Sequence, residues 1–472
     1  MPRWREVGLP ETAGRQAPAI PATVIPIIYA GLLLLLPSML VIQQIGAPGT
    51  PANLWAITGL VIWLCMTVGG LNPVRGLTPT RVTLAMFIIT VLLSYISGNL
   101  AGWFQPADIH QRSDALWRAV TIERLNEALI SAGDRGLLAL CGWAGVMLLT
   151  AESPRRWADL ERIVTWVVAF ATVVAALGIF QYFTGANVAA WFQIPGLSTL
   201  RDQNVYTRSI VNRVVVTAAH PIELGVVAAA IFPLALHRSL YAAKKWLPWV
   251  QAAMILMVLL MSVSRSAIIV LAVGMLVLLV GWPARRRLWA LAIIPVATAV
   301  LRAALPGLLG TLRALFTNLE DDPSIAGRTD DYEIIYRMAQ DHPIFGQGLY
   351  TWVPFYFRTL DNQVLMFALE IGFIGLAVFV VLTLTHLVGV LVARTRVRDQ
   401  RSRHLGLAVV AATAGLLSAY VTFDAISFRM AAGMTFLLLG MAGAIWNLTY
   451  VSPPTNQTLS ADSLDPPGGR TP

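Results

Sequence analysis

The sequence predicts an all-α, polytopic membrane protein with about twelve transmembrane helices. Three observations lead to this fold class: 57% of the 472 residues are hydrophobic, only 12% are charged, and the apolar segments are long and unbroken. No soluble domain of this length has such a composition. Inside a bilayer the backbone must satisfy its own hydrogen bonds, so long apolar segments form helices.

Each apolar segment has about the length that a helix needs to cross the hydrocarbon core. We place the helices at residues 22–43, 54–71, 82–104, 134–151, 160–183, 214–236, 246–263, 266–282, 288–305, 362–392, 405–423 and 428–450. The first segment is longer than the apolar core of a signal peptide, and we therefore interpret it as a spanning helix.

Positive charge sets the predicted orientation, because short loops rich in Lys and Arg stay in the cytoplasm. Alternate loops hold most of the 34 Lys and Arg residues, which places both termini in the cytoplasm. The expected parts are a cytoplasmic tail (1–21), a transmembrane domain (22–450) and a disordered cytoplasmic tail (451–472) rich in Pro, Ser, Thr and Gly. This topology accounts for the net charge of +9, and no nucleic-acid partner is expected.

A smaller set of charged residues lies on the predicted outer side, and these residues are the candidates for a site. Arg213 and Arg265 fall at outer helix ends, and Arg328 falls in the one large outer loop, 306–361. Arginine side chains bind phosphate oxygens bidentately, so the set suits an anionic lipid-phosphate substrate. The structural alternatives are a snorkelling side chain at Arg265 and a surface ion pair at Arg328.

His220 follows Arg213 by seven residues in the expected sixth helix. Seven residues are close to two whole turns, so the two side chains could face one direction. Pro221 frees backbone carbonyls, which often marks a functional break in a membrane helix. Glu223, which follows, and Asn362 are secondary candidates for the site. The structural alternatives are a satisfied core histidine for His220 and a salt bridge within the bundle for Glu223.

Asp361 and Asn362 stand where the large loop re-enters the membrane. Asp361 is either the N-cap of the next helix or a carboxylate at the membrane edge that takes a proton from a hydroxyl. Glu370, about two turns deeper on the same expected helix, is a secondary candidate of the same kind.

Five segments resemble the O-antigen ligase and O-antigen polymerase superfamily of bacterial membrane glycan enzymes. They are GIFQYFTG (178–185), RVVVTAAHPIELG (213–225), SVSRSA (262–267), GRTDDYEIIYRMAQDHPIFGQGLYTW (327–352) and DNQVLMFALEIGFIGL (361–376). The resemblance covers about residues 160–392. It implies transfer of a glycan from undecaprenyl diphosphate to a glycan or lipid acceptor, at the outer face of the bacterial cytoplasmic membrane and among its lipids.

The resemblance also implies site residues. The reaction would use no metal and no cofactor, and Arg213 and Arg265 would hold the diphosphate. In the family a histidine normally precedes the asparagine that matches Asn362, whereas this chain has Asp361. Aspartate has a lower intrinsic pKa than histidine and cannot become a cation. Three outcomes stay open: Asp361 replaces the histidine, His220 assists, or the chain is inactive.

Two other functional classes remain open. A membrane transporter or flippase of a lipid-linked or anionic substrate fits the topology equally, although neither related halves nor mid-membrane ion pairs are evident in the sequence. An inactive partner of a glycan assembly machine is the third class, and the aspartate at position 361 is its main support. Within the enzyme class, the polymerase and the ligase differ only in acceptor, and both stay open.

Overall fold

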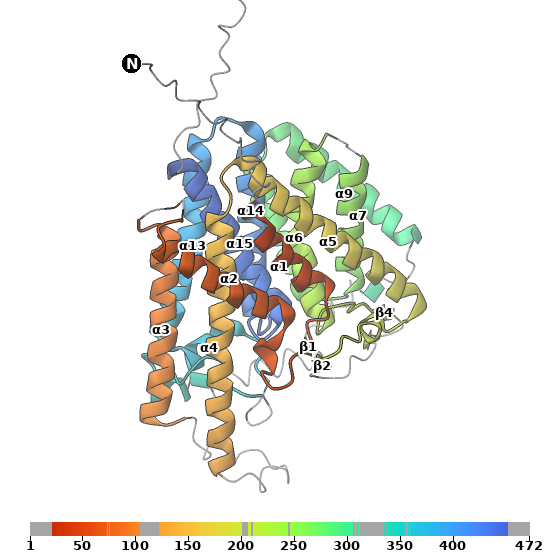
Figure 1. Cartoon of the computed structure of the whole chain (residues 1–472). Helices are drawn as coiled ribbons and strands as arrows, with labels where there is room; N and C mark the ends of the chain where they lie inside the picture. Colours follow the sequence, from red (N-terminus) through yellow and green to blue (C-terminus); the bar gives the residue numbers. More distant parts are fainter. Residues whose placement is uncertain are drawn as a thin grey trace, which may run out of the picture.

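The computed structural model describes residues 21–72, 74, 76–103, 122–200, 206–208, 211–243, 246–304, 307, 310–311, 335–336, 338–354, 357 and 359–451. Within these residues the chain is a bundle of helices (Figure 1). Arg328, most of the predicted outer loop and both predicted tails apart from their innermost residues lie outside this part of the chain.

Helices occur in the predicted order. They are α1 (Val24–Leu35), α2 (Pro51–Val68), α3 (Pro79–Ala101), α4 (Ile122–Glu152), α5 (Trp157–Thr184), α6 (Pro221–Tyr241), α7 (Trp246–Met261), α8 (Arg265–Gly281), α9 (Ala284–Ala304), α12 (Gln363–Glu370), α13 (Gly372–Arg396), α14 (Gln400–Ser418) and α15 (Arg429–Tyr450). The shorter elements are β1 (Leu40–Val41), η1 (Ala47–Gly49), η4 (Val188–Trp191), β2 (Ser198–Thr199), β3 (Tyr206–Arg208), β4 (Val211–Arg213) and η5 (Ala419–Val421). In the described residues, eight helices are long and apolar enough to cross a membrane, and α1, α7 and α8 are shorter apolar helices. The helical membrane class is confirmed, while the number of about twelve spans and the orientation stay predictions.

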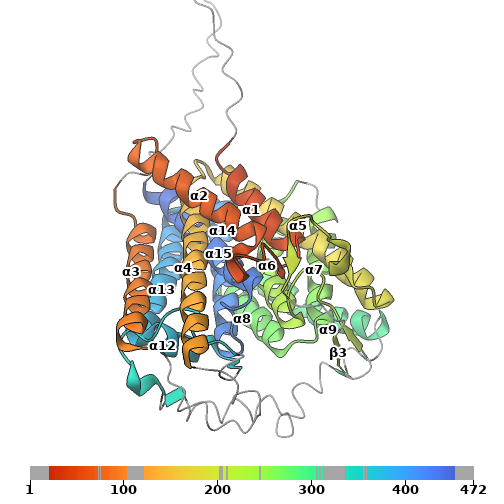
Figure 2. The same cartoon turned by 60° about the horizontal axis from the view of Figure 1, so that its bottom comes forward.

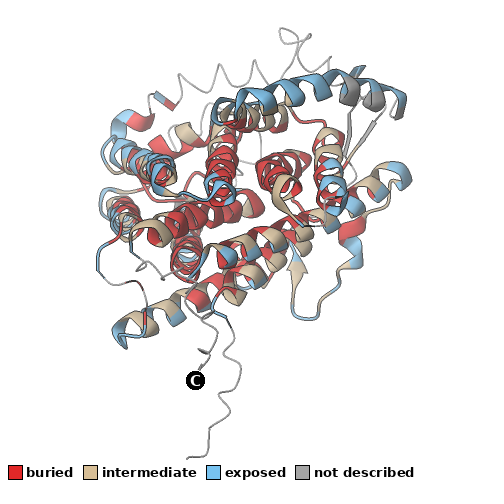
Figure 3. Cartoon of the chain, turned by 90° about the horizontal axis from the view of Figure 1, so that it is seen from above, coloured by how far each residue is buried: buried red, intermediate tan, exposed pale blue. Residues whose placement is uncertain are grey.

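The centre of the bundle is formed by α6, α14 and α15. In α15, 89% of the apolar stretch is buried within the protein, against 17% in α2 at the periphery. α15 packs against α4, and α14 packs against α6 and α8. Seen from one end, buried positions fill the middle and exposed positions face outward (Figure 3). Much of that outward surface is apolar, which suits contact with lipid.

The first helix is shorter than the prediction of 22–43. It stops at Leu36, whose backbone is extended (ψ 144°) because the next residue is Pro37. The chain then forms β1, which pairs antiparallel with β2, so Leu40 lies opposite Thr199. The sequence analysis missed this pairing, because neither two-residue strand is long enough to show an alternating pattern.

Residues 214–220 are not helical, contrary to the prediction of a helix that starts at 214. They follow β4, which pairs with β3, and α6 begins only after His220. His220 is the N-cap of α6, and its Nδ1 accepts a hydrogen bond of 3.2 Å from the backbone N–H of Ile222. Pro221 takes the first helical position, where a missing N–H costs nothing. His220 therefore lies at a helix end and not two turns inside a helix.

The predicted helix at 362–392 is two helices. α12 ends at Glu370, and α13 begins at Gly372, whose φ of +66° favours glycine. The carbonyl oxygen of Glu370 leaves the helical pattern and accepts hydrogen bonds from the backbone N–H of Gly348 (2.8 Å) and from the hydroxyl of Ser94 in α3 (2.5 Å). Figure 2 turns this end of the bundle forward and shows α12 beside α3 and α13. The break therefore fixes the carboxyl end of α12 against a neighbouring helix.

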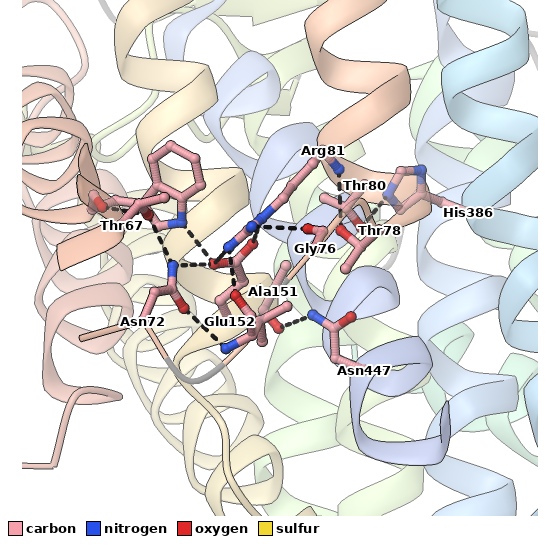
Figure 4. Close-up of polar contacts among 12 residues, drawn as sticks. Thr67, Asn72, Gly76, Thr78, Thr80, Arg81, Ala151, Glu152, His386 and Asn447 are labelled. Carbon is pink, nitrogen blue, oxygen red and sulfur yellow. Dashed lines mark hydrogen bonds and ion pairs between the residues drawn. The ribbon is translucent and has the colours of Figure 1, made fainter. Parts of the chain in front are cut away.

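At the opposite end of the bundle, Glu152 ties α2, α3 and α4 together (Figure 4). Its carboxylate accepts hydrogen bonds from Arg81 Nε (2.7 Å) and Nη2 (2.8 Å), from Asn72 Nδ2 (2.6 Å) and from Trp63 Nε1 (2.7 Å). The side chains of Arg81 and Glu152 are only 14% and 3% exposed. Arg81 is thus part of a buried network that holds three helices together.

Candidate functional site

Arg213 and the turn before α8 come together in space. The Nε of Arg213 donates a hydrogen bond of 3.0 Å to the carbonyl oxygen of Ser262. The turn continues through Ser264, whose hydroxyl caps α8, and Arg265 is the first residue of that helix. The two arginines that the sequence proposed as a pair are therefore linked through one short turn.

Close packing holds this turn against α6. A Cβ atom added at Gly225 would lie 2.2 Å from the hydroxyl oxygen of Ser262, so a side chain at this position would force α6 and the turn apart. Glycine at the start of α6 therefore permits the contact between Arg213 and Ser262 to form.

Strained backbone occurs on both sides of this contact. Val216 (φ +53°), Val263 (φ +48°) and Tyr350 (φ +69°) are the non-glycine residues with positive φ in the described part of the chain. Such conformations cost about 1–3 kcal/mol each and tend to cluster at functional sites. The side-chain oxygen of Gln181 supports the first of them by accepting hydrogen bonds from the N–H groups of Val215 (2.8 Å) and Val216 (2.9 Å). Gln181 belongs to a resembling segment, yet sequence analysis gave it no role.

His220 is a neutral side chain at pH 7. Burial, and then the charge of Arg213, lower its pKa to about 4. Its Nδ1 accepts the bond from Ile222, so the ring proton of the neutral form is on Nε2. His220 therefore offers a hydrogen-bond donor, which suits a phosphate oxygen better than it suits removal of a proton. The ring lies beside that of Phe428, with 6.2 Å between centroids.

Glu223 binds backbone groups at two helix ends. One carboxylate oxygen accepts from the N–H of Met430 (2.7 Å), and the other accepts from the N–H of Ala219 (2.6 Å) and from the hydroxyl of Ser38 (3.4 Å). A negative charge at the amino end of α15 is favourable. Glu223 therefore joins α6 to α15 through backbone groups, and not through the salt bridge that the sequence analysis gave as its structural alternative.

Asn362, and not Asp361, caps α12. Its side-chain oxygen accepts from the N–H groups of Val364 (3.0 Å) and Leu365 (3.3 Å). Asp361 is a half-buried carboxylate one residue earlier. The pKa of the nearby Asp424 carboxyl is raised to about 7, first by burial and then by the negative charge of Asp361. Sequence analysis missed Asp424, which carried no signal beyond its place between the last two helices.

A pocket of about 220 Å³ opens between α1, α2, α4, α12 and α15. Glu370 lines it, is fully buried, and has its pKa raised to about 8, chiefly by burial. Its Oε1 accepts from the N–H of Trp352 (3.4 Å), whereas no described residue bonds its Oε2. Burial thus favours the protonated, neutral form of the Glu370 carboxyl.

Arg429, a second residue that sequence analysis missed, lines the same pocket. Its Nε donates to the carbonyl of Ala47 (2.9 Å) and its Nη1 to the carbonyl of Ser38 (3.1 Å). The preceding residue, Phe428, faces His220. The connection between α14 and α15 therefore lies between the arginine turn and the pocket.

Residues 250–380 match the model of a protein family described as O-Antigen ligase. This stretch of the chain is therefore similar to an O-antigen ligase domain. This match confirms the superfamily resemblance that the sequence segments indicated. A comparison with curated proteins finds no match.

The O-antigen ligase domain runs from α7 into α13 and contains Arg265, Asp361 and Glu370. Arg213 and His220 come from the segment before it, and Arg429 comes from the segment after it. With the membrane helices, the domain supports a bacterial membrane protein of a glycosyl-transfer family. The parts of the candidate site outside the domain are held to it by the contact at Ser262 and by the α14–α15 connection.

Proposed function

We propose that this protein transfers a glycan from undecaprenyl diphosphate to an acceptor hydroxyl at the outer face of the bacterial cytoplasmic membrane. The hydrogen bond between Arg213 and Ser262 carries the proposal. It joins the arginine beside His220 to the turn that begins with Arg265 in the O-antigen ligase domain. Two guanidinium groups and a neutral imidazole donor at one helix-end turn suit a diphosphate.

The reaction is a single displacement. Asp361 takes the proton from the acceptor hydroxyl, and the hydroxyl oxygen attacks the anomeric carbon of the donor glycan. The bond from that carbon to the diphosphate oxygen breaks, and the electron pair leaves with undecaprenyl diphosphate. Arg213 and Arg265 stabilise the developing negative charge, and His220 donates from Nε2. The diphosphate is already a good leaving group, so the step needs no further activation.

A lipid flippase is the second candidate, and the break between α12 and α13 favours it. Interrupted helices frequently form substrate sites in transporters. Glu370, at the end of α12, is a buried side chain of the kind found in such sites. The glycan analysis below separates the two functions.

The test measures undecaprenyl-linked and envelope-attached glycans in cells that lack the gene. The cells are complemented with wild type, with Arg265→Ala, or with Arg302→Ala as an exposed arginine elsewhere in the same domain. Single repeats on the carrier identify a polymerase, and long chains left on the carrier identify a ligase. Donor confined to the inner leaflet identifies a flippase. Normal glycans with Arg265→Ala contradict the arginine mechanism.

A further inference from the structure

We infer that the pocket between α4, α12 and α15 binds one uncharged sugar ring of the acceptor. This inference rests on the proposed function and assigns it an acceptor subsite, separate from the arginine turn that would hold the donor. Pocket size, lining, charge and position each contribute to the assignment.

The size and the lining suit a single ring. The volume of about 220 Å³ is below the range of about 300–1,000 Å³ that is usual for drug-sized ligands. Trp143, Tyr350 and Trp352 line the pocket, and Tyr350 meets Trp143 edge to face with 6.1 Å between ring centroids. Rigid aromatic walls offer apolar surface to the C–H faces of a sugar ring. Tyr350 is also one of the residues with positive φ, so the wall is built on strained backbone.

The polar groups of the pocket suit hydroxyls. A protonated Glu370 both donates and accepts hydrogen bonds, and its Oε2 has no partner among the described residues. Arg429 is oriented by the two carbonyl groups that bind its Nε and Nη1, and no hydrogen bond from its Nη2 is found within the described part of the chain. A ring with several hydroxyls can serve both groups at once.

The charge of the pocket argues against a second anionic ligand. The carboxylate of Glu223 lies within Coulomb range of Arg429 and offsets its charge. Arg135 is exposed and belongs to the pocket lining, so solvent screens its charge. A neutral ring needs no further compensating charge, whereas a diphosphate would.

The position of the pocket completes the argument. Phe428 faces His220, and the next residue, Arg429, lines the pocket. Asp424 lies within Coulomb range of both Asp361 and Glu370. Asp424 therefore couples Glu370 of the pocket electrostatically to Asp361, the proposed base.

The experiment places a larger side chain in the pocket, so that a sugar ring can no longer bind there. Ala132 of α4 lines the pocket and is 7% exposed, so Ala132→Leu occupies space that the ring would take. Asn126→Leu adds the same side chain on an exposed position of the same helix. Three quantities are measured: glycan transfer in complemented cells, binding of undecaprenyl diphosphate to purified protein, and Tm. Ala132→Leu should lower transfer by at least about tenfold and leave undecaprenyl diphosphate binding unchanged. Asn126→Leu should resemble wild type in all three.

Glu370→Leu is the second variant. It tests the pocket assignment if Ala132→Leu lowers Tm and so cannot be interpreted. It should also lose transfer and keep carrier binding. Normal transfer by the folded variant overturns the pocket assignment, and so does a joint loss of transfer and carrier binding. Unchanged glycans in cells lacking the gene, or normal carrier binding by Arg213→Ala and Arg265→Ala, would instead remove the proposed function itself.

Discussion

Arg213 donates from Nε to the carbonyl oxygen of Ser262 at 3.0 Å, which ties the end of β4 to the turn before α8. The bond fixes one edge of the guanidinium group and thereby its plane. It also holds the positive charge where it lowers the pKa of His220.

Replacing Arg213 should show whether its shape or only its charge matters. Arg213→Ala should reduce the transfer rate about 100-fold, the usual loss for one donor that stabilises developing charge. Arg213→Lys keeps the charge but cannot keep both the Nε bond and a bidentate phosphate contact, so we expect about a tenfold reduction. The rate is measured with purified protein and a lipid-linked donor. Equal rates for lysine and arginine would show that charge alone is sufficient.

Asp361 should be required as the base. Asp361→Asn retains the shape of the side chain and removes its ability to take a proton, so transfer should fall by about 100-fold or more. Asp361→His should recover part of the loss, because imidazole can also act as a base at neutral pH. Transfer is followed together with undecaprenyl diphosphate binding, which both variants should retain. An asparagine variant as active as wild type would assign the base elsewhere, with Asp424 as the first residue to examine.

Gln181 should stabilise the strained segment before α6. Gln181→Leu leaves the buried N–H groups of Val215 and Val216 without an acceptor, which costs about 1–3 kcal/mol for each group. We expect a lower Tm and reduced transfer, because the same segment positions Arg213 and His220. Gln193→Leu alters an exposed glutamine and serves as the control. If Gln181→Leu unfolds at the wild-type temperature, the two bonds do not stabilise the segment.

Glu370 should make stability depend on pH. Its pKa is about 8 in the folded protein and about 4.3 in an unfolded chain, so the folded state holds the proton more tightly. The stability due to the neutral carboxyl is fully present below the unfolded pKa and is lost as the pH rises through about 8. Glu370→Gln cannot ionise, so its Tm relative to wild type should increase over this range. Glu127→Gln, an exposed position on α4, should show no such trend. Parallel Tm curves for Glu370→Gln and wild type would contradict a neutral Glu370.

The Arg81–Glu152 network should matter for folding and not for transfer. Glu152→Ala leaves a buried guanidinium without its partner and should cost about 3–5 kcal/mol. The double variant Arg81→Met, Glu152→Leu should recover part of that stability because neither charge remains. Both effects are read from Tm in detergent. Protein that remains folded should bind undecaprenyl diphosphate normally, and a loss of binding there would give the network a role in the site.

The sequence predicted the helices well wherever a long apolar segment lies between short polar loops. It failed over 214–220, where the apolar run VVVTAA fits a helix and a buried extended segment equally. Long-range contacts decide between them: Gln181 binds the backbone of Val215 and Val216, and Thr217 binds the carbonyl of Leu34. No local pattern carries that information.

The candidate site was predicted in part for the same reason. Arg213 and Arg265 were identified as a pair because charges at helix ends stand out in an apolar sequence. Asp424 and Arg429 were missed because their significance lies in partners far along the chain, such as Ser38 and Ala47 for Arg429. Glu370 was proposed as a base, but burial raises the pKa of its carboxyl, and burial is a property of the fold and not of the residue.

The bond from Arg429 to Ser38 spans 391 positions of the chain, which has a consequence for biosynthesis. Translation delivers the segment between α1 and α2 well before its guanidinium partner at the start of α15. Glu223, which bonds the same serine, is made about midway. The contacts of Ser38 with Arg429 therefore form only after α15 has been synthesised. A chain that stops before α15 lacks Arg429, and with it the contacts that join α15 to the segment between α1 and α2.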